Sequence, residues 1–529
     1  MSLKVMLLLA FLITVPAHAW TISVQGACTD SEKWEVKGKV PAEMLDLFKS
    51  IPTDPDKNIE KLKSVISLQA NSHRERKIIA DFWFFRTLFQ LGLIHPSQSG
   101  FARVASESKL KGLGSIQRAC VQCLAKIHTD RRHLPFSKQE TNALLQIPMS
   151  QIPHSIEELF WELRARWLLK QLSEDEPNQP QPLERNLALF ESNNQYKFVA
   201  EALVLLQRGE KASMAKRLSE LLRNNRIPAS FSPIADFGHL VLARLEAENA
   251  QYAAALSEYG KISQRSQWYF PALLESAWIS LHQKNYERAI GLVYNLHGSH
   301  VPPSLTAEGL IIASIAFSET CYFPEAKRAL HILKKAFSDS YGWLDKLERS
   351  KKQDLYALAV NFVNKKHMLP SPVAAEWLRS PLFLAGQEEI NLILDERQML
   401  ETLLKRLIPL LDIKGKAAAA HYLVEEQKHG HLRESALISQ LNRDLSIIST
   451  KMFSRLRERW TDGRMIEIEI LSKAGDEMRS QPSQNDSLAA AGFAVWRWGK
   501  QAALSLENDE IWADELGAFR AAIKSKCPK

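Results

Sequence analysis

Apolar residues recur at intervals of three and four along most of this chain. In residues 156–173, for example, Leu159, Leu163 and Trp167 follow one another at every fourth position. Because one turn of an α-helix takes about 3.6 residues, this period places apolar side chains on one helix face. The same pattern, without strand-like alternation of useful length, predicts an all-α protein with amphipathic helices at about 59–69, 75–93, 156–173, 183–206, 214–224, 237–247, 271–283 and 305–321.

A small residue follows an aromatic one with a regular spacing in the middle of the chain. Ala255, Ala289 and Ala326 each lie three places after a Tyr or Phe, and they are 34 and then 37 residues apart. A period near 34 residues with helix–turn–helix content is typical of the tetratricopeptide repeat (TPR), whose helical pairs bury their apolar faces by stacking. Residues 236–340 resemble that family at these positions. The resemblance implies a TPR-like α-solenoid with a concave binding surface.

The pattern changes beyond about residue 374. Residues 390–411 and 416–480 predict long helices with few breakers. Their spacing favours a long helical hairpin with a coiled-coil-like seam. Such a hairpin either caps the open end of the solenoid or forms an arm for oligomerisation or a partner. The seam positions in the second helix are Leu432, Leu437, Leu441, Leu445 and Ile448.

Two polar segments that contain proline, residues 175–182 and 481–486, predict linkers. With these linkers the sequence predicts five parts in order along the chain. They are a signal peptide (1–19), an N-terminal helical array (20–174), a TPR-like solenoid (183–373), a long-helix hairpin (374–482) and an aromatic C-terminal tail (483–529).

The N-terminus predicts an export signal. Lys4 precedes a mainly apolar run from Val5 to Val15, and residues 17–19 (Ala-His-Ala) offer a small-residue cleavage site. The run is much shorter than the roughly 20 residues of a spanning helix. We therefore expect an exported, periplasmic protein that does not span the membrane after cleavage. The net charge of +8 is spread along the helices, which argues against nucleic acid as a partner.

Five cysteines in an exported chain predict disulfide bonds, and their odd number leaves at least one thiol unpaired within the chain. Cys120 and Cys123 are candidates for disulfides or buried thiols. Cys28 and Cys527, near the two ends, either pair with each other or serve locally. The spacing of Cys120, Cys123 and two later histidines also resembles a zinc knuckle. Helix-forming residues between them, without a glycine for the turn, argue against metal.

No phosphate-binding glycine loop, hydrolase nucleophile elbow or zinc-protease motif occurs, so we expect no enzyme and no cofactor. His429 and His431 flank a glycine and indicate a solvated bend rather than a metal site. Glu275-Ser276 and the later Gly291-Leu292 resemble part of two motifs of lytic transglycosylases, in which the Glu is the general acid and base. The Gly-Ala element between those motifs is missing here. A peptidoglycan-active or peptidoglycan-binding accessory protein built on Glu275 is the alternative function.

A narrower resemblance covers the order of the parts and a short tail motif. In order, the parts are the signal peptide, the repeats, the Arg-Ser-Pro-Leu junction at 379–382, the long helices and the Trp-x-Asp-Glu-Leu-Gly tail at 512–517. In this order and in the tail motif the chain is similar to exported envelope TPR proteins of deltaproteobacteria, some of them associated with gliding motility. The resemblance implies a non-enzymatic envelope scaffold that binds one or more envelope proteins. In TPRs the first helix of each pair lines the concave face. The expected contact residues are therefore the polar residues His239, Arg244, Glu275, His282 and Ser318.

Overall fold

The computed structural model shows an all-α protein, with one short two-stranded ladder near the C-terminus. The described residues are 74–107, 114–130, 201, 205, 210–223, 232–297, 301–350, 353–366, 368–411, 417–480, 494–496, 520–523 and 525–527. The predicted signal peptide, Cys28, both predicted linkers and most of the aromatic tail lie outside them. Among the described helices, none is long and apolar enough to cross a bilayer.

The chain forms two compact units, and each combines segments that are distant in sequence. Unit 1 contains the described residues up to Met214 together with Ala385–Ser439. Unit 2 contains Ala215–Leu384 together with the chain from Gln440 onward. Residues 374–482, which the sequence predicts as one hairpin, are therefore shared between the two units.

Among the described residues, unit 1 contains three helices and the adjoining parts of two long ones. They are α4 (Arg74–Gln90), α5 (Ile94–Glu107), α6 (Gly114–Asp130), α20 (Pro381–Leu411) from residue 385 and α21 (Ala417–Ser480) up to residue 439. Within this unit α20 and α21 run antiparallel, because Arg397 forms an ion pair with Glu434 while Leu403 shares a core with Leu423.

The core of unit 1 is rich in phenylalanine. Phe82, Phe84, Phe85 and Phe101 are all buried. A glycine is required at position 100, where a Cβ atom would lie 2.0 Å from the Phe85 ring. The absence of a side chain there lets α5 approach α4 closely.

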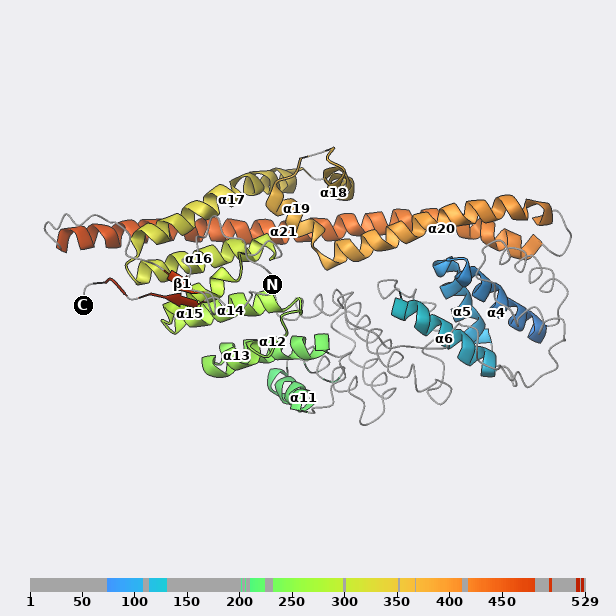
Figure 1. Ribbon diagram of the computed structural model, residues 1–529, viewed down its shortest axis with the longest axis horizontal. Coiled ribbons are helices and arrows are strands. Elements are labelled where there is room, and N and C mark those ends of the chain that lie inside the picture. The colour runs from blue at the N-terminus through green and yellow to red at the C-terminus, as the bar shows by residue number, and fades with distance from the viewer. Residues whose placement is uncertain are drawn as a thin grey trace. The chain divides into compact units, whose positions relative to one another are not determined.

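Unit 2 contains a series of shorter helices, followed by the second part of α21 (Figure 1). In chain order the shorter helices are α11 (Lys211–Arg223), α12 (Ser232–Glu248), α13 (Tyr252–Tyr259), α14 (Tyr269–His282), α15 (Tyr286–Tyr294), α16 (Pro303–Glu319), α17 (Phe323–Arg349), α18 (Leu355–Val363) and α19 (Ser371–Leu378).

Three consecutive helix pairs of unit 2 share one turn geometry, which recurs at Lys365 (φ 56°) between α18 and α19. The pairs are α12–α13, α14–α15 and α16–α17, and the turns hold Ala250, Lys284 and Cys321 at φ of 58°, 58° and 59°. In each turn the next backbone N–H donates to the carbonyl five residues earlier, at 2.8 Å. This left-handed cap satisfies helix-end carbonyls and reverses the chain between two antiparallel helices. The three residues are 34 and 37 residues apart, as the alanines are.

The three alanines of the repeated pattern lie inside unit 2. Ala255, Ala289 and Ala326 are fully buried, and so are Ala243 and Ala277 on the preceding helices. A side chain with a single methyl group lets two helix backbones come close together, which explains the recurring small residue at these positions.

The C-terminal ladder belongs to unit 2. Strand β1 (Ala494–Trp496) pairs antiparallel with β2 (Arg520–Ala522), so that Val495 faces Ala521, and β2 packs against α15. Ile523 follows β2 and is buried in the core of the unit. Its N–H donates to Glu287 at 3.3 Å.

Candidate functional site

Two of the predicted contact residues meet directly. The Arg244 guanidinium on α12 donates to both carboxylate oxygens of Glu275 on α14, with Nη2–Oε1 at 2.6 Å and Nε–Oε2 at 2.9 Å. The Tyr259 hydroxyl on α13 donates to Oε2 of the same carboxylate at 2.6 Å. The cluster therefore ties together three successive helices, and the charges of Arg244 and Glu275 satisfy each other.

Partial burial strengthens this cluster. The Arg244 and Glu275 side chains are 24% and 29% exposed. Burial alone would lower the pKa of Arg244, but the Glu275 carboxylate outweighs this effect and raises it. Burial and the same carboxylate raise the pKa of Tyr259, so its hydroxyl stays a donor at all ordinary pH values. Glu275 thus receives hydrogen bonds from a permanent cation and a permanent neutral donor.

A second polar cluster links α12 and α13. His239 Nδ1 lies 2.7 Å from Glu258 Oε2, and Lys261 Nζ lies 2.5 Å from the other oxygen. Burial would raise the pKa of Glu258, but Lys261 and His239 outweigh it and keep it below its usual value. His239 is therefore engaged within the protein, as Arg244 is.

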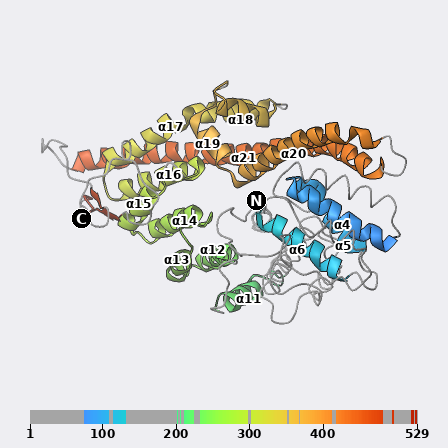
Figure 2. The same cartoon turned by 45° about the vertical axis from the view of Figure 1, so that its right-hand side comes forward.

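The other two predicted contact residues differ in exposure. His282 lies exposed at the end of α14. Ser318 on α16 is only 3% exposed, and among the described residues its hydroxyl has no hydrogen-bond partner. Ser318 is therefore enclosed within unit 2 in this structure, whereas His282 is accessible. The reason is that α16 is buried on nearly all sides, with α21 lying along it and α17 in both views (Figures 1 and 2).

Several contacts show that α21 packs against α14, α16 and α17. A Cβ atom on Gly463 of α21 would lie 3.5–3.7 Å from side-chain methyl carbons of Ile311, Leu330 and Leu333. The Arg459 guanidinium lies 6.0 Å from the ring centre of Trp278, whose Nε1 donates to Glu308 at 2.8 Å.

Further along α21, aromatic and polar contacts reach α17 and α19. Trp460 stacks on Tyr341 with ring centres 5.3 Å apart and an interplanar angle of 20°. Trp377 of α19 is fully buried and donates from Nε1 to the Ser449 hydroxyl at 2.9 Å. These contacts fix both the position and the rotation of α21 within unit 2.

The apolar side of α21 belongs to the core of unit 2. Burying a large apolar side chain is worth about 1.5–3 kcal/mol, so six such side chains contribute on the order of 10 kcal/mol. A partner that binds with micromolar affinity gains only about 8 kcal/mol. A ligand of that strength cannot replace α21, which is therefore part of the folded unit and not a displaceable lid. The six residues are Leu445, Met452, Phe453, Leu456, Ile466 and Ile470.

The opposite side of α21 carries an exposed apolar strip. Met465, Ile468 and Leu471 are 66%, 65% and 55% exposed and lie at intervals of three residues. Arg457 and Arg464 are also exposed on this helix. Sequence reasoning named seam positions only as far as Ile448 and did not identify this strip. The signal that reveals it is an excess of apolar residues, since Ile466 and Ile470 already fill the buried side.

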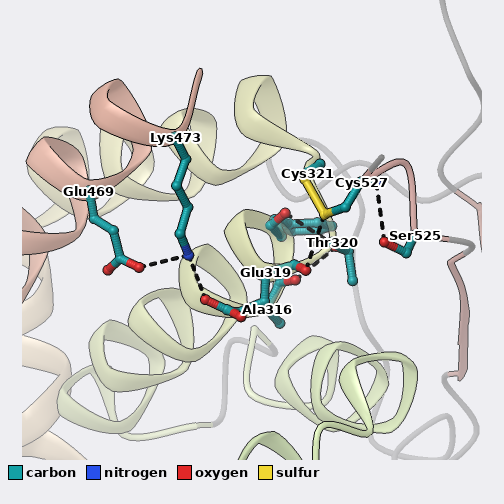
Figure 3. The surroundings of a disulfide bond; sticks show 9 residues. Ala316, Glu319, Thr320, Cys321, Glu469, Lys473, Ser525 and Cys527 are labelled. Carbon is teal, nitrogen blue, oxygen red and sulfur yellow. Dashed lines mark hydrogen bonds and ion pairs between the residues drawn. A yellow bond between two sulfur atoms is a disulfide. The ribbon is translucent and has the colours of Figure 1, made fainter. Parts of the chain in front are cut away.

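A disulfide fastens the C-terminus of the chain to the turn between α16 and α17. Cys321, the left-handed residue of that turn, is bonded to Cys527 with Cα atoms 5.1 Å apart (Figure 3). The Lys526 N–H donates to the Thr320 carbonyl at 3.1 Å, and its ammonium lies 4.4 Å from the centre of the Tyr322 ring. Cys527 thus pairs within unit 2, and the pairing with Cys28 that the sequence left open is not formed.

The remaining cysteines do not form a zinc knuckle. Cys120 is a free thiol, fully buried, and burial raises its pKa well above the usual value. It is therefore not a disulfide cysteine. Cys123 is disulfide-bonded, and its partner lies outside the described residues. Cys123 cannot serve as a thiolate ligand while it is oxidised. In the described part of the chain, no group of three or more His, Cys, Asp or Glu residues is placed to hold a metal ion.

Unit 1 also contains a buried charged cluster. His95, at the start of α5, is held by Glu396 of α20, which accepts from its N–H at 2.8 Å and meets its Nδ1 at 2.8 Å. Glu389 lies 3.7 Å from its Nε2. Burial alone would lower the pKa of His95, but the two carboxylates outweigh it and raise the pKa to about 9. This imidazolium joins α5 to α20 through its charge.

Comparison with known protein families and with curated proteins finds no match for this chain.

Proposed function

We propose that this protein is an exported, non-enzymatic scaffold of a bacterial cell envelope, built as a TPR-like α-solenoid that binds one or more partner proteins. The observation that carries the proposal is the repeated helix pair in unit 2, with the same left-handed turn at residues 250, 284 and 321. Stacked pairs of this kind present long faces on which another chain can lie, and binding proteins is their usual use.

Disulfide bonding supports export to the periplasm. The bond between Cys321 and Cys527 and the oxidised state of Cys123 require an oxidising compartment in most bacteria. A cytoplasmic chain would keep these thiols reduced. The predicted signal peptide at residues 1–19, an independent part of the sequence, also indicates export.

The surroundings of Glu275 favour a structural role over catalysis. A general acid must present a protonated carboxyl group to its substrate. The Glu275 carboxylate instead accepts hydrogen bonds from the Arg244 guanidinium and the Tyr259 hydroxyl, so both of its oxygens are engaged within the protein. This arrangement weighs against the lytic transglycosylase alternative.

The covered face limits where a partner protein binds. Because α21 packs on Ile311, Leu330 and Leu333 of α16 and α17, the binding surface consists of faces that remain exposed. Those faces include the end of α14 at His282 and the outward side of α21.

The test is affinity purification of the tagged, mature protein from cross-linked cells of its native host, followed by mass spectrometry. We expect a reproducible set of envelope proteins, recovered equally with Glu275→Gln, which is isosteric and preserves the cluster's shape. In parallel, the purified protein is sedimented with isolated peptidoglycan and assayed for lysis by turbidity. Recovery of wall fragments without proteins, or lysis that Glu275→Gln abolishes, would replace the scaffold by the wall-active alternative.

A further inference from the structure

We propose that the outward side of α21 between Arg457 and Leu471 is a docking surface for an acidic amphipathic helix of a partner protein. The inference rests on the proposed scaffold function and specifies where and how the partner binds. We name this surface the outer strip, and it consists of Arg457, Arg464, Met465, Ile468 and Leu471.

The outer strip has the layout of a helix-binding surface. Met465, Ile468 and Leu471 cover two helical turns, about 9 Å at 1.5 Å per residue. A partner helix with apolar residues at i, i+3, i+4 and i+7 presents a stripe of matching length. The opposite side of α21 is anchored in the core, so the strip is rigid before binding. A rigid surface loses less conformational entropy when a partner docks.

The charges on the outer strip determine the chemistry of the partner. No ion pair is formed by Arg457 or Arg464 with any described residue, and the Arg457 guanidinium lies 5.8 Å from the centre of the Phe453 ring. The acidic residues of this stretch pair with other cations: Glu467 with Lys334, Glu469 with Lys473, and Glu458 and Asp462 with Arg459. The strip is therefore apolar with uncompensated positive charge, and its complement is apolar with negative charge.

A second copy of the chain fits this strip less well. In a parallel pair of α21 helices, Arg457 and Arg464 would each face their own counterparts, and like charges repel. In an antiparallel pair centred on Ile468, Arg464 would face Ser472, which carries no charge. Both arrangements leave the arginines without a partner, whereas an acidic helix pairs with them.

A lipid surface also fits less well. A helix that lies on a membrane needs a long apolar face flanked by basic residues. Here the three consecutive exposed apolar residues span only two turns, and polar residues follow on the same side toward the N-terminus, at Ser454, Glu458 and Thr461, before the next exposed apolar residue, Ile447. The outer strip is as short as the row of apolar side chains with which a helix of a partner protein binds.

The test places a photo-cross-linking amino acid at position 468 of the full-length protein in native-host cells. Cross-linked peptides are then identified by mass spectrometry. We expect a peptide from another envelope protein, with net negative charge and apolar residues at helical spacing. A peptide from a second copy of this chain, a lipid adduct, or no cross-link would overturn the proposal.

The mapped peptide is next synthesised and titrated against purified variants by fluorescence anisotropy. Ile468→Ser and Arg464→Glu should each weaken binding at least about 10-fold, the loss typical of a central interface residue. The matched control is Leu432→Ser, which removes an equally exposed leucine (66%) from the unit 1 part of the same helix. Binding that is lost equally in the control, or retained in both strip variants, would overturn the proposal.

The two proposals fail in different ways. If affinity purification recovers partner proteins and the strip variants still retain them, the docking surface is wrong while the scaffold function stands. If no partner protein is recovered with the wild-type chain, the scaffold function itself fails.

Discussion

The packing of α21 on α16 and α17 is best tested at Gly463, which faces side chains of both helices. A Cβ atom there would lie at ordinary contact distance, 3.5–3.7 Å, from Leu330, Ile311 and Leu333. One methyl group therefore fits, and three further carbons do not. Gly463→Ala should stabilise the protein by about 1–2 kcal/mol, from helix propensity and one buried methyl group. Gly463→Leu should destabilise it by about 1–3 kcal/mol through overpacking.

The assay is urea unfolding followed by circular dichroism and tryptophan fluorescence, with Gly342 of α17 as the matched site. A Cβ atom on Gly342 meets nothing within 4 Å, so Gly342→Ala and Gly342→Leu should both stabilise by about 0.5–1 kcal/mol. If Gly463→Leu were as stable as Gly342→Leu, the packing of α21 described above would be refuted.

Three further predictions concern the charged clusters and the disulfide. The folded-state pKa of His95 is about 9, against an ordinary 6.5, which adds about 3 kcal/mol of stability. This stability is fully present below pH 6.5 and is lost as pH rises through 9. Unfolding titrations at a series of pH values should show the loss, and His95→Gln should abolish this pH dependence. Replacing Cys321 and Cys527 by Ser should destabilise the protein by about 2–5 kcal/mol, which lowers its melting temperature, and should expose the C-terminus to protease. An unchanged melting temperature and digestion pattern would show that the bond is not formed. Arg244→Glu should cost about 1–2 kcal/mol in urea unfolding, and adding Glu275→Arg should recover at least half of it; an additive double variant would contradict the pairing.

The helical class and the small packing positions were predictable from the sequence because they depend on local periodicity. Ala255, Ala289 and Ala326 are fully buried, and the turns between their helices share one geometry. Helix period and small-residue spacing act over a few turns of chain, so a single sequence carries them. The predicted hairpin seam was only partly informative. Leu441 and Leu445 are buried, whereas Leu432 is 66% exposed.

The position of α21 was not predictable in this way, since it depends on contacts between residues more than 100 positions apart. Gly463 meets Ile311, and Lys473 pairs with Glu319, but neither spacing leaves a pattern in one sequence. The burial of Ser318 was likewise not predicted. One available signal was the apolar character of residues 309–317 on every side of the helix, which is typical of a helix buried all round. The pairing of Cys321 with Cys527 is of the same long-range kind.

The measurement that tests the scaffold most directly is cross-linked affinity purification of the mature chain from its native envelope, quantified against a tagged control of similar size. The proposed function predicts specific envelope proteins that are enriched reproducibly with the wild-type chain and with Glu275→Gln. Enrichment of peptidoglycan fragments alone, with no protein above the control, would contradict it.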